Sequence, residues 1–136
     1  MAKLYLEPFE DMGDPAILLS GDRDGFRMFH TAVREAHETG QATFEFDGIT
    51  HHFVREDDAA DVELGSQEVF WRFSDEALVE LLDLIPPLID PPGPGHQYVD
   101  LNGPVDLLVL SVDEYNRPLS YGVFSQLYPA TTQTEQ

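Results

Sequence analysis

Hydrophobic and polar residues alternate through the middle of the chain, in residues 41–73, as they do in β-strands with one buried face. Two alternating runs flank Asp47-Gly48, a dipeptide that suits the two positive-φ positions of a type I′ hairpin turn. A two-residue turn fixes the register of three facing pairs: Phe46 with Ile49, Phe44 with His51, and Ala42 with Phe53. The apolar side chains of this hairpin are therefore expected on one face.

A second hairpin is predicted directly after the first. Gly65-Ser66 would join residues 62–64 to residues 67–73, which places Val62 opposite Val69 and Glu63 opposite Glu68. We therefore expect residues 41–73 to form a four-stranded antiparallel meander.

Two segments carry apolar residues at spacings of three and four, the pattern of an amphipathic helix. The first covers about residues 24–39, after three possible N-caps (Ser20, Asp22 and Asp24) and before Gly40, and its apolar stripe is Phe26, Phe29, Val33 and Ala36. The second covers residues 75–85, between the N-cap Ser74 and the pair Pro86-Pro87, and its stripe is Leu78, Leu81, Leu82 and Ile85.

Shorter apolar runs predict the remaining strands. They lie at residues 3–7, ending at Pro8, at 16–19, and at 97–101 and 106–112 around Asn102-Gly103. The run 106–112 is apolar on both sides, which favours a central position. The expected fold is a single α+β domain over residues 1–128, with the two helices packed on one face of a mainly antiparallel sheet and a disordered tail at 129–136.

The composition limits the class of protein. A chain of 136 residues without cysteine is long enough to bury a core and is not stapled by disulfides. It contains no apolar run of about 18 residues, and its first residues lack the apolar region of a signal peptide. We therefore expect a cytoplasmic protein without a membrane segment.

Acidic residues dominate the charge. The chain has 26 acidic and 7 basic residues, for a net charge of −19, which repels nucleic acids and anionic membranes. Three explanations stay open at this point: adaptation to a salty cytoplasm, attraction to a basic partner protein, and cation binding.

The acidic residues are densest around the predicted second hairpin. We expect a partner-binding surface there, made by the acidic side chains and one apolar anchor: Asp57, Asp58, Asp61, Glu63, Glu68 and Phe70. The forced pairing of Glu63 with Glu68 would cost stability, which a sequence selected for folding alone does not require. The alternative interpretation is a solvated edge that resists strand-to-strand aggregation.

The chain lacks the common catalytic signatures: a cysteine nucleophile, G-x-S-x-G, G-x-x-x-x-G-K-[ST] and H-E-x-x-H. A protein without enzymatic activity, cofactor or metal is therefore the main expectation. The alternative is a small metal- or ligand-dependent enzyme that uses His51, His96 and Asp100.

The segment Ile17-Leu-Leu-Ser-Gly-Asp-Arg-Asp-Gly-Phe26, a strand that runs through S-G-D-R-x-G into a helix, resembles small acidic bacterial proteins. Some of these are immunity proteins of polymorphic toxin systems. Residues 95–100 and 108–111 are similar in character. The resemblance implies a stoichiometric, non-enzymatic binder of a partner protein, and it assigns no functional residue.

Overall fold

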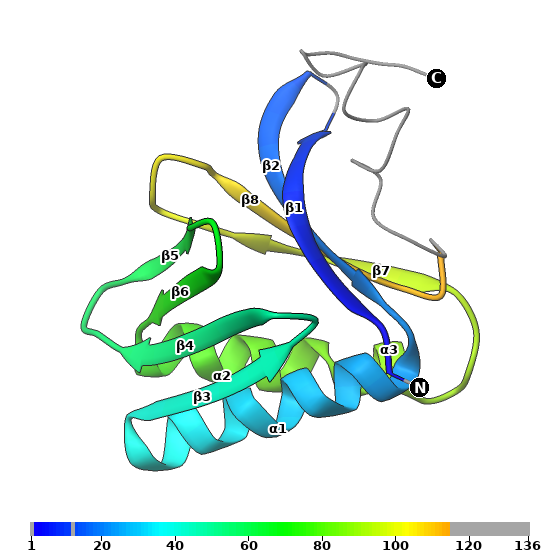
Figure 1. The fold of residues 1–136 in the computed structure, drawn as a ribbon, viewed down its shortest axis with the longest axis horizontal. Coiled ribbons are helices and arrows are strands. Elements are labelled where there is room, and N and C mark those ends of the chain that lie inside the picture. Colours follow the sequence, from blue (N-terminus) through cyan, green and yellow to red (C-terminus); the bar gives the residue numbers. More distant parts are fainter. Residues whose placement is uncertain (1, 12, 115–136) are drawn as a thin grey trace.

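The computed structural model describes residues 2–11 and 13–114, which fold into two four-stranded sheets and three helices (Figure 1). The predicted α+β class is confirmed. The aromatic segment 115–128 and the predicted tail 129–136 lie outside the described residues.

The first sheet, sheet A, has the strand order β1-β2-β8-β7. It consists of β1 (Leu4–Asp11), β2 (Asp14–Gly21), β7 (Gly95–Asp100) and β8 (Leu107–Val112). The outer pairings are antiparallel, whereas β2 and β8 run parallel in the centre. The central position predicted for the doubly apolar run 106–112 is therefore confirmed.

The end predicted for the first strand at Pro8 is wrong. Strand β1 continues to Asp11 and pairs with β2 along its whole length. The strand tolerates proline because β1 lies at the edge of sheet A, where one side of the backbone has no neighbouring strand to bond.

The second sheet, sheet B, is built from the central segment that the sequence predicted. It consists of β3 (Gln41–Phe46), β4 (Ile49–Arg55), β5 (Ala60–Leu64) and β6 (Glu68–Phe73). The register predicted for the first hairpin is confirmed at all three facing pairs. The neighbour order, however, is β3-β4-β6-β5 with β4 and β6 parallel, so these four strands do not form a meander.

Burial explains why β6 takes the inner position. Val69, Trp71 and Phe73 are all buried, and a central strand covers such residues better than an edge strand. Strand β5 exposes Glu63 and Leu64 and suits the edge.

The register predicted for the second hairpin is wrong by two residues. Val62 faces Trp71 and Glu63 faces Phe70, because the chain turns through the four residues 65–68 rather than through Gly65-Ser66 alone. The N–H of Gly65 donates to the carbonyl of Glu68 (2.7 Å) and closes this longer turn.

Both predicted helices are present. Helix α1 (Arg23–Thr39) begins after Asp22, whose side chain accepts a hydrogen bond from the N–H of Gly25, and ends at Gly40 in the left-handed conformation. Helix α2 (Asp75–Leu84) is capped by Ser74. The two prolines after it start a further short helix, α3 (Pro86–Ile89), since proline is tolerated in the first helical turn.

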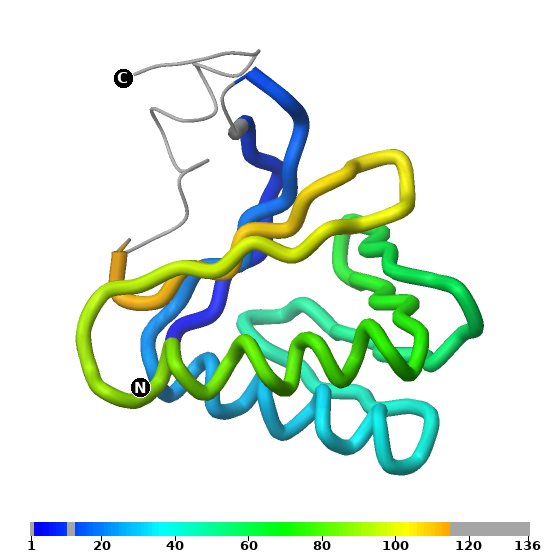
Figure 2. The backbone as a smooth tube through the Cα atoms, turned by 180° about the vertical axis from the view of Figure 1, so that it is seen from behind, coloured from blue at the N-terminus to red at the C-terminus, as the bar shows by residue number. Residues whose placement is uncertain are grey.

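Helices α1 and α2 pack against each other and against the inner face of sheet B (Figures 1 and 2). The ring of Phe29 in α1 lies 5.6 Å from that of Phe53 and 5.1 Å from that of Trp71. These three residues are fully buried and form the centre of the core. None of the helices in the described part of the chain is long and apolar enough to cross a membrane.

The start of β1 is fitted tightly against the start of α1. The N–H of Asp22 donates to the carbonyl of Lys3, and the N–H of Lys3 donates back to the Asp22 carboxylate, each at 3.0 Å. A Cβ on Gly25 would lie 1.9 Å from the Lys3 carbonyl oxygen, and one on Gly21 would lie 2.2 Å from it. Glycine is needed at both positions because backbone occupies the space of a side chain.

Gly25→Ala is therefore expected to lower the free energy of unfolding by roughly 1–3 kcal/mol, as the first strand must move away from α1. Urea unfolding followed by circular dichroism measures this change. Gly95→Ala is the control, because its new Cβ would meet Leu88 at an ordinary 3.6 Å. Equal stability of the two variants would contradict the steric argument.

Candidate functional site

The six residues predicted as a binding surface lie together. Four of them occupy the outward face of sheet B: Asp61, Glu63, Glu68 and Phe70. They alternate along β5 and β6 with the buried residues Val62, Val69 and Trp71, and successive side chains of a strand point to opposite faces. Asp57 and Asp58 belong to the loop that leads into β5. We call this surface, with His52 and Arg72, the acidic face.

Phe70 lies at the centre of the acidic face and is only partly buried. The ring of His52, its neighbour on β4, stacks on it with centroids 4.9 Å apart and planes 13° apart. The guanidinium carbon of Arg72 lies 5.5 Å from the Phe70 ring centre. Glu63 faces Phe70 from the edge strand. An apolar ring is thus presented between polar side chains, as in the anchor residue of a protein interface.

Arg72 already neutralises part of the acidic face. It makes ion pairs with Glu63 (2.8 Å) and Asp61 (3.4 Å), and the hydrogen bond with Glu63 raises the pKa of its guanidinium. Glu68 lies 3.3 Å from the His52 ring. These interactions hold the side chains around Phe70 in place.

Asp57 and Asp58 are different, because both are exposed and their carboxylates form no ion pair with any of the described residues. They are therefore the acidic groups of this surface that can accept a cationic side chain without first losing a partner.

The loop that carries these two aspartates is held by a residue far away in sequence. Asn102, between β7 and β8, donates from Nδ2 to the carbonyl of Asp58 (2.8 Å), and its Oδ1 accepts from the N–H of Ala60 (3.1 Å). Its own N–H donates to the carbonyl of Ala60 (2.9 Å). From the sequence, Asn102 is predicted only as a turn residue, because no local pattern links two loops more than 40 residues apart.

Gly103 completes this contact. A Cβ at Gly103 would lie 2.0 Å from Oδ1 of Asp61, so a larger residue would displace the carboxylate that pairs with Arg72. Between the two loops lies a polar hollow of about 390 Å³, lined mainly by acidic side chains and by Arg72, Asn102 and Gly103. Glu56, Asp57, Asp58 and Asp61 supply four carboxylates against the one guanidinium.

The observed register of β5 and β6 contradicts the predicted pairing of Glu63 with Glu68. Glu63 does not face Glu68, so the unfavourable like-charge pair does not exist as predicted. Acidic residues are also exposed elsewhere, for example Glu76 and Glu80 on α2. The acidic face is distinguished by the combination of a half-buried aromatic ring, a polar hollow, and two aspartates that make no ion pair within residues 2–11 and 13–114.

His51, His96 and Asp100 are not brought together. His51 lies in sheet B, whereas His96 and Asp100 lie in sheet A. Asp100 lies four positions after His96 on the same strand, which is about 13 Å at the usual rise per residue. Within residues 2–11 and 13–114, no group of three or more metal-ligating side chains is close enough to hold an ion.

His96 has a different local partner. Its Nδ1 lies 3.1 Å from Oε2 of Glu114, and the hydroxyl of Ser111 donates to the other oxygen of the same carboxylate. The carboxylate therefore lies between serine and histidine. A nucleophilic serine needs the histidine next to it, so this arrangement does not activate Ser111.

His51 belongs to the core, where it is 4% exposed. Its Nδ1 accepts a hydrogen bond from Nε1 of Trp71 (3.1 Å), and its ring stacks on Phe44 with centroids 4.5 Å apart. Burial, with a smaller contribution from His52, lowers the pKa of His51 from its ordinary 6.5 to about 4. The imidazole is therefore neutral at pH 7.

The pKa of His51 predicts a pH-dependent stability. As the pH falls below 6.5, His51 becomes protonated in the unfolded chain, whereas in the folded chain it stays neutral down to about pH 4. The contribution of His51 to the free energy of unfolding is therefore complete above pH 6.5 and is lost as the pH falls from 6.5 to 4. Between pH 7 and pH 5 the loss should be about 2 kcal/mol. Urea unfolding of the wild type and of His51→Phe at both pH values measures it, and the same pH dependence in both proteins would contradict the assignment.

Asn102→Ala should release the loop of the acidic face. Two side-chain hydrogen bonds are lost, at about 1–2 kcal/mol of stability in total. Hydrogen exchange at the N–H of Ala60, which bonds to Asn102, should become faster than in the wild type. Unchanged exchange at Ala60 would show that Asn102 does not hold this loop.

Comparison with known proteins gives little further information. No protein-family model and no curated protein matches the chain. The crystal structure of Drosophila Suppressor of Fused is similar to it with a TM-score of 0.46 and 14% sequence identity, over 82% of this chain and 26% of that chain. This chain therefore corresponds to about a quarter of the length of that protein.

Proposed function

We propose that this protein is a non-enzymatic, cytoplasmic binding protein whose acidic face engages a basic partner protein. The observation that carries the proposal is the position of Phe70, a partly exposed aromatic ring on the outward face of sheet B, between His52 and Arg72 and opposite Glu63. Aromatic anchors within a polar rim are typical of protein interfaces.

Binding would proceed in two steps. The net charge of −19 attracts a basic protein over a long range and accelerates its encounter with the acidic face. A lysine or arginine of the partner then enters the hollow beside Asp57 and Asp58, while an apolar group covers Phe70. Because Arg72 and Asn102 already hold the surrounding side chains and loop, little ordering is needed on binding.

The most concrete form of the proposal is an immunity protein that neutralises a basic toxin domain by covering its surface. The resemblance of residues 17–26 to such proteins supports this form. In the fold, these residues build the junction between β2 and α1, with Asp22 as the helix cap and Gly21 and Gly25 against Lys3. They support the fold, and the acidic face carries the binding.

The proposal is tested by affinity capture from a lysate of the source organism, followed by measurement of the binding of the captured protein. Phe70→Ala should weaken binding by about tenfold or more, through loss of the anchor. Asp57→Asn/Asp58→Asn should slow association roughly threefold to tenfold at low salt and less at high salt.

Glu76→Gln/Glu80→Gln is the matched control, because it changes the net charge equally on the exposed side of α2. It should leave affinity nearly unchanged. The proposal fails if the captured protein binds both double variants equally and tolerates Phe70→Ala, with circular dichroism showing that all variants fold.

A further inference from the structure

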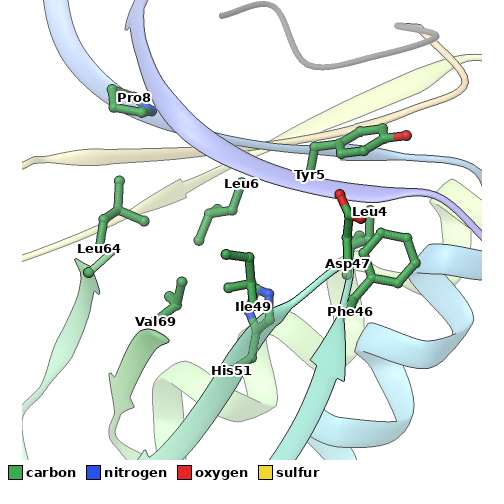
Figure 3. Close-up of a pocket in the computed structure, with 11 residues that line it drawn as sticks. Leu4, Tyr5, Leu6, Pro8, Phe46, Asp47, Ile49, His51, Leu64 and Val69 are labelled. Atoms are coloured by element: carbon green, nitrogen blue, oxygen red, sulfur yellow. The ribbon is translucent and has the colours of Figure 1, made fainter. Parts of the chain in front are cut away.

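A second feature is independent of the acidic face. A cleft of about 410 Å³ lies between β1 of sheet A and the turn ends of the two hairpins of sheet B (Figure 3). Its walls are apolar side chains from both sheets: Leu4, Leu6, Phe46, Ile49, Leu64 and Val69. Its volume falls in the range of roughly 300–1,000 Å³ that is usual for small-molecule sites.

His51 is the polar group at the base of this cleft (Figure 3). Nδ1 accepts the hydrogen bond from Trp71, so in the neutral ring the proton is on Nε2. Nε2 makes no hydrogen bond with the described residues, and it is not among their fully buried side-chain atoms, so it keeps some accessible surface. Because His51 is one of the residues that line the cleft, we take the cleft as the side to which Nε2 is accessible. A fixed N–H donor is thus presented in an apolar space.

The rim of the cleft sets the charge that it accepts. Asp47, exposed in the first hairpin turn, and Tyr5, whose ring meets that of Phe46 edge to face at 6.3 Å, lie at the entrance. A carboxylate at the entrance and a net charge of −19 repel anions. A donor at the base does not stabilise a cationic group, which has no acceptor to offer.

We infer that this cleft binds a neutral, mainly apolar small molecule through one hydrogen-bond acceptor, such as a carbonyl oxygen. The acceptor takes the Nε2 proton of His51, and the hydrocarbon part lies against Leu6, Ile49 and Val69. The bond to Trp71 holds the imidazole in the orientation and tautomer that this contact needs.

The probe is 2-heptanone, a neutral molecule with one carbonyl oxygen, titrated into ¹⁵N-labelled protein at pH 7. Trp71 is the single tryptophan of the chain, so its indole N–H signal reports directly on His51. Binding should be saturable with a Kd on the order of 1 mM or tighter, and should shift the signals of Trp71 Nε1 and His51 Nε2. Heptanoate, the matched anion, should bind at least tenfold more weakly.

Two variants locate the site. His51→Phe keeps the ring and removes the donor, so affinity should fall about tenfold. Ile49→Phe fills the cleft from a partly exposed position and should abolish binding while His51 and Trp71 remain. The inference is overturned if 2-heptanone causes no saturable shift, if heptanoate binds equally well, or if Ile49→Phe binds 2-heptanone as the wild type does. The heptanoate and Ile49→Phe measurements test the inference even if His51→Phe does not fold.

Discussion

The packing of Phe29 against Phe53 and Trp71 is the interaction on which the rest of the structure depends. It joins α1 to the two central strands of sheet B and buries the middle of the inner face of that sheet. Because both helices occupy the inner side, the outward face keeps its polar side chains and Phe70 accessible. The same core places His51 beside Trp71, where burial keeps its ring neutral. The acidic face and the apolar cleft are thus the two sides of a single sheet.

Specific ion pairs and hydrogen bonds fix the positions of the charged groups on the acidic face. Arg72 offsets Asp61 and Glu63, which reduces repulsion within the folded protein, whereas Asp57 and Asp58 form no ion pair with any residue that the structure describes. The hydrogen bonds of Asn102 connect their loop to sheet A, so the position of these aspartates depends on both sheets. This arrangement favours a partner that brings cations to the loop and an apolar group to Phe70.

Local chemistry was predictable from the sequence, and long-range pairing was not. Asp47-Gly48 fixed one hairpin register because a two-residue turn admits one pairing. The register predicted for the second hairpin was wrong by two residues. A shift of two residues keeps Val62 on the core side, so the hydrophobic pattern is the same in both registers. That shift moved Glu63 from Glu68 to Phe70. The parallel pairing of β4 with β6 and the contact of Asn102 with residues 58 and 60 join distant segments that no periodicity connects. The structure brings the six candidate residues onto one surface, but the residue that faces Glu63 is Phe70 and not the predicted Glu68.

We propose that a basic partner covers the acidic face. Carboxyl-group footprinting of the protein, alone and in complex with its captured partner, tests it most directly, because a water-soluble carbodiimide with an amine labels exposed carboxylates one by one. Protection of Asp57, Asp58, Glu63 and Glu68 in the complex, with Glu76 and Glu80 on α2 labelled as before, is the predicted result. Protection of Glu76 and Glu80 with unchanged labelling at Asp57 and Asp58 would contradict it.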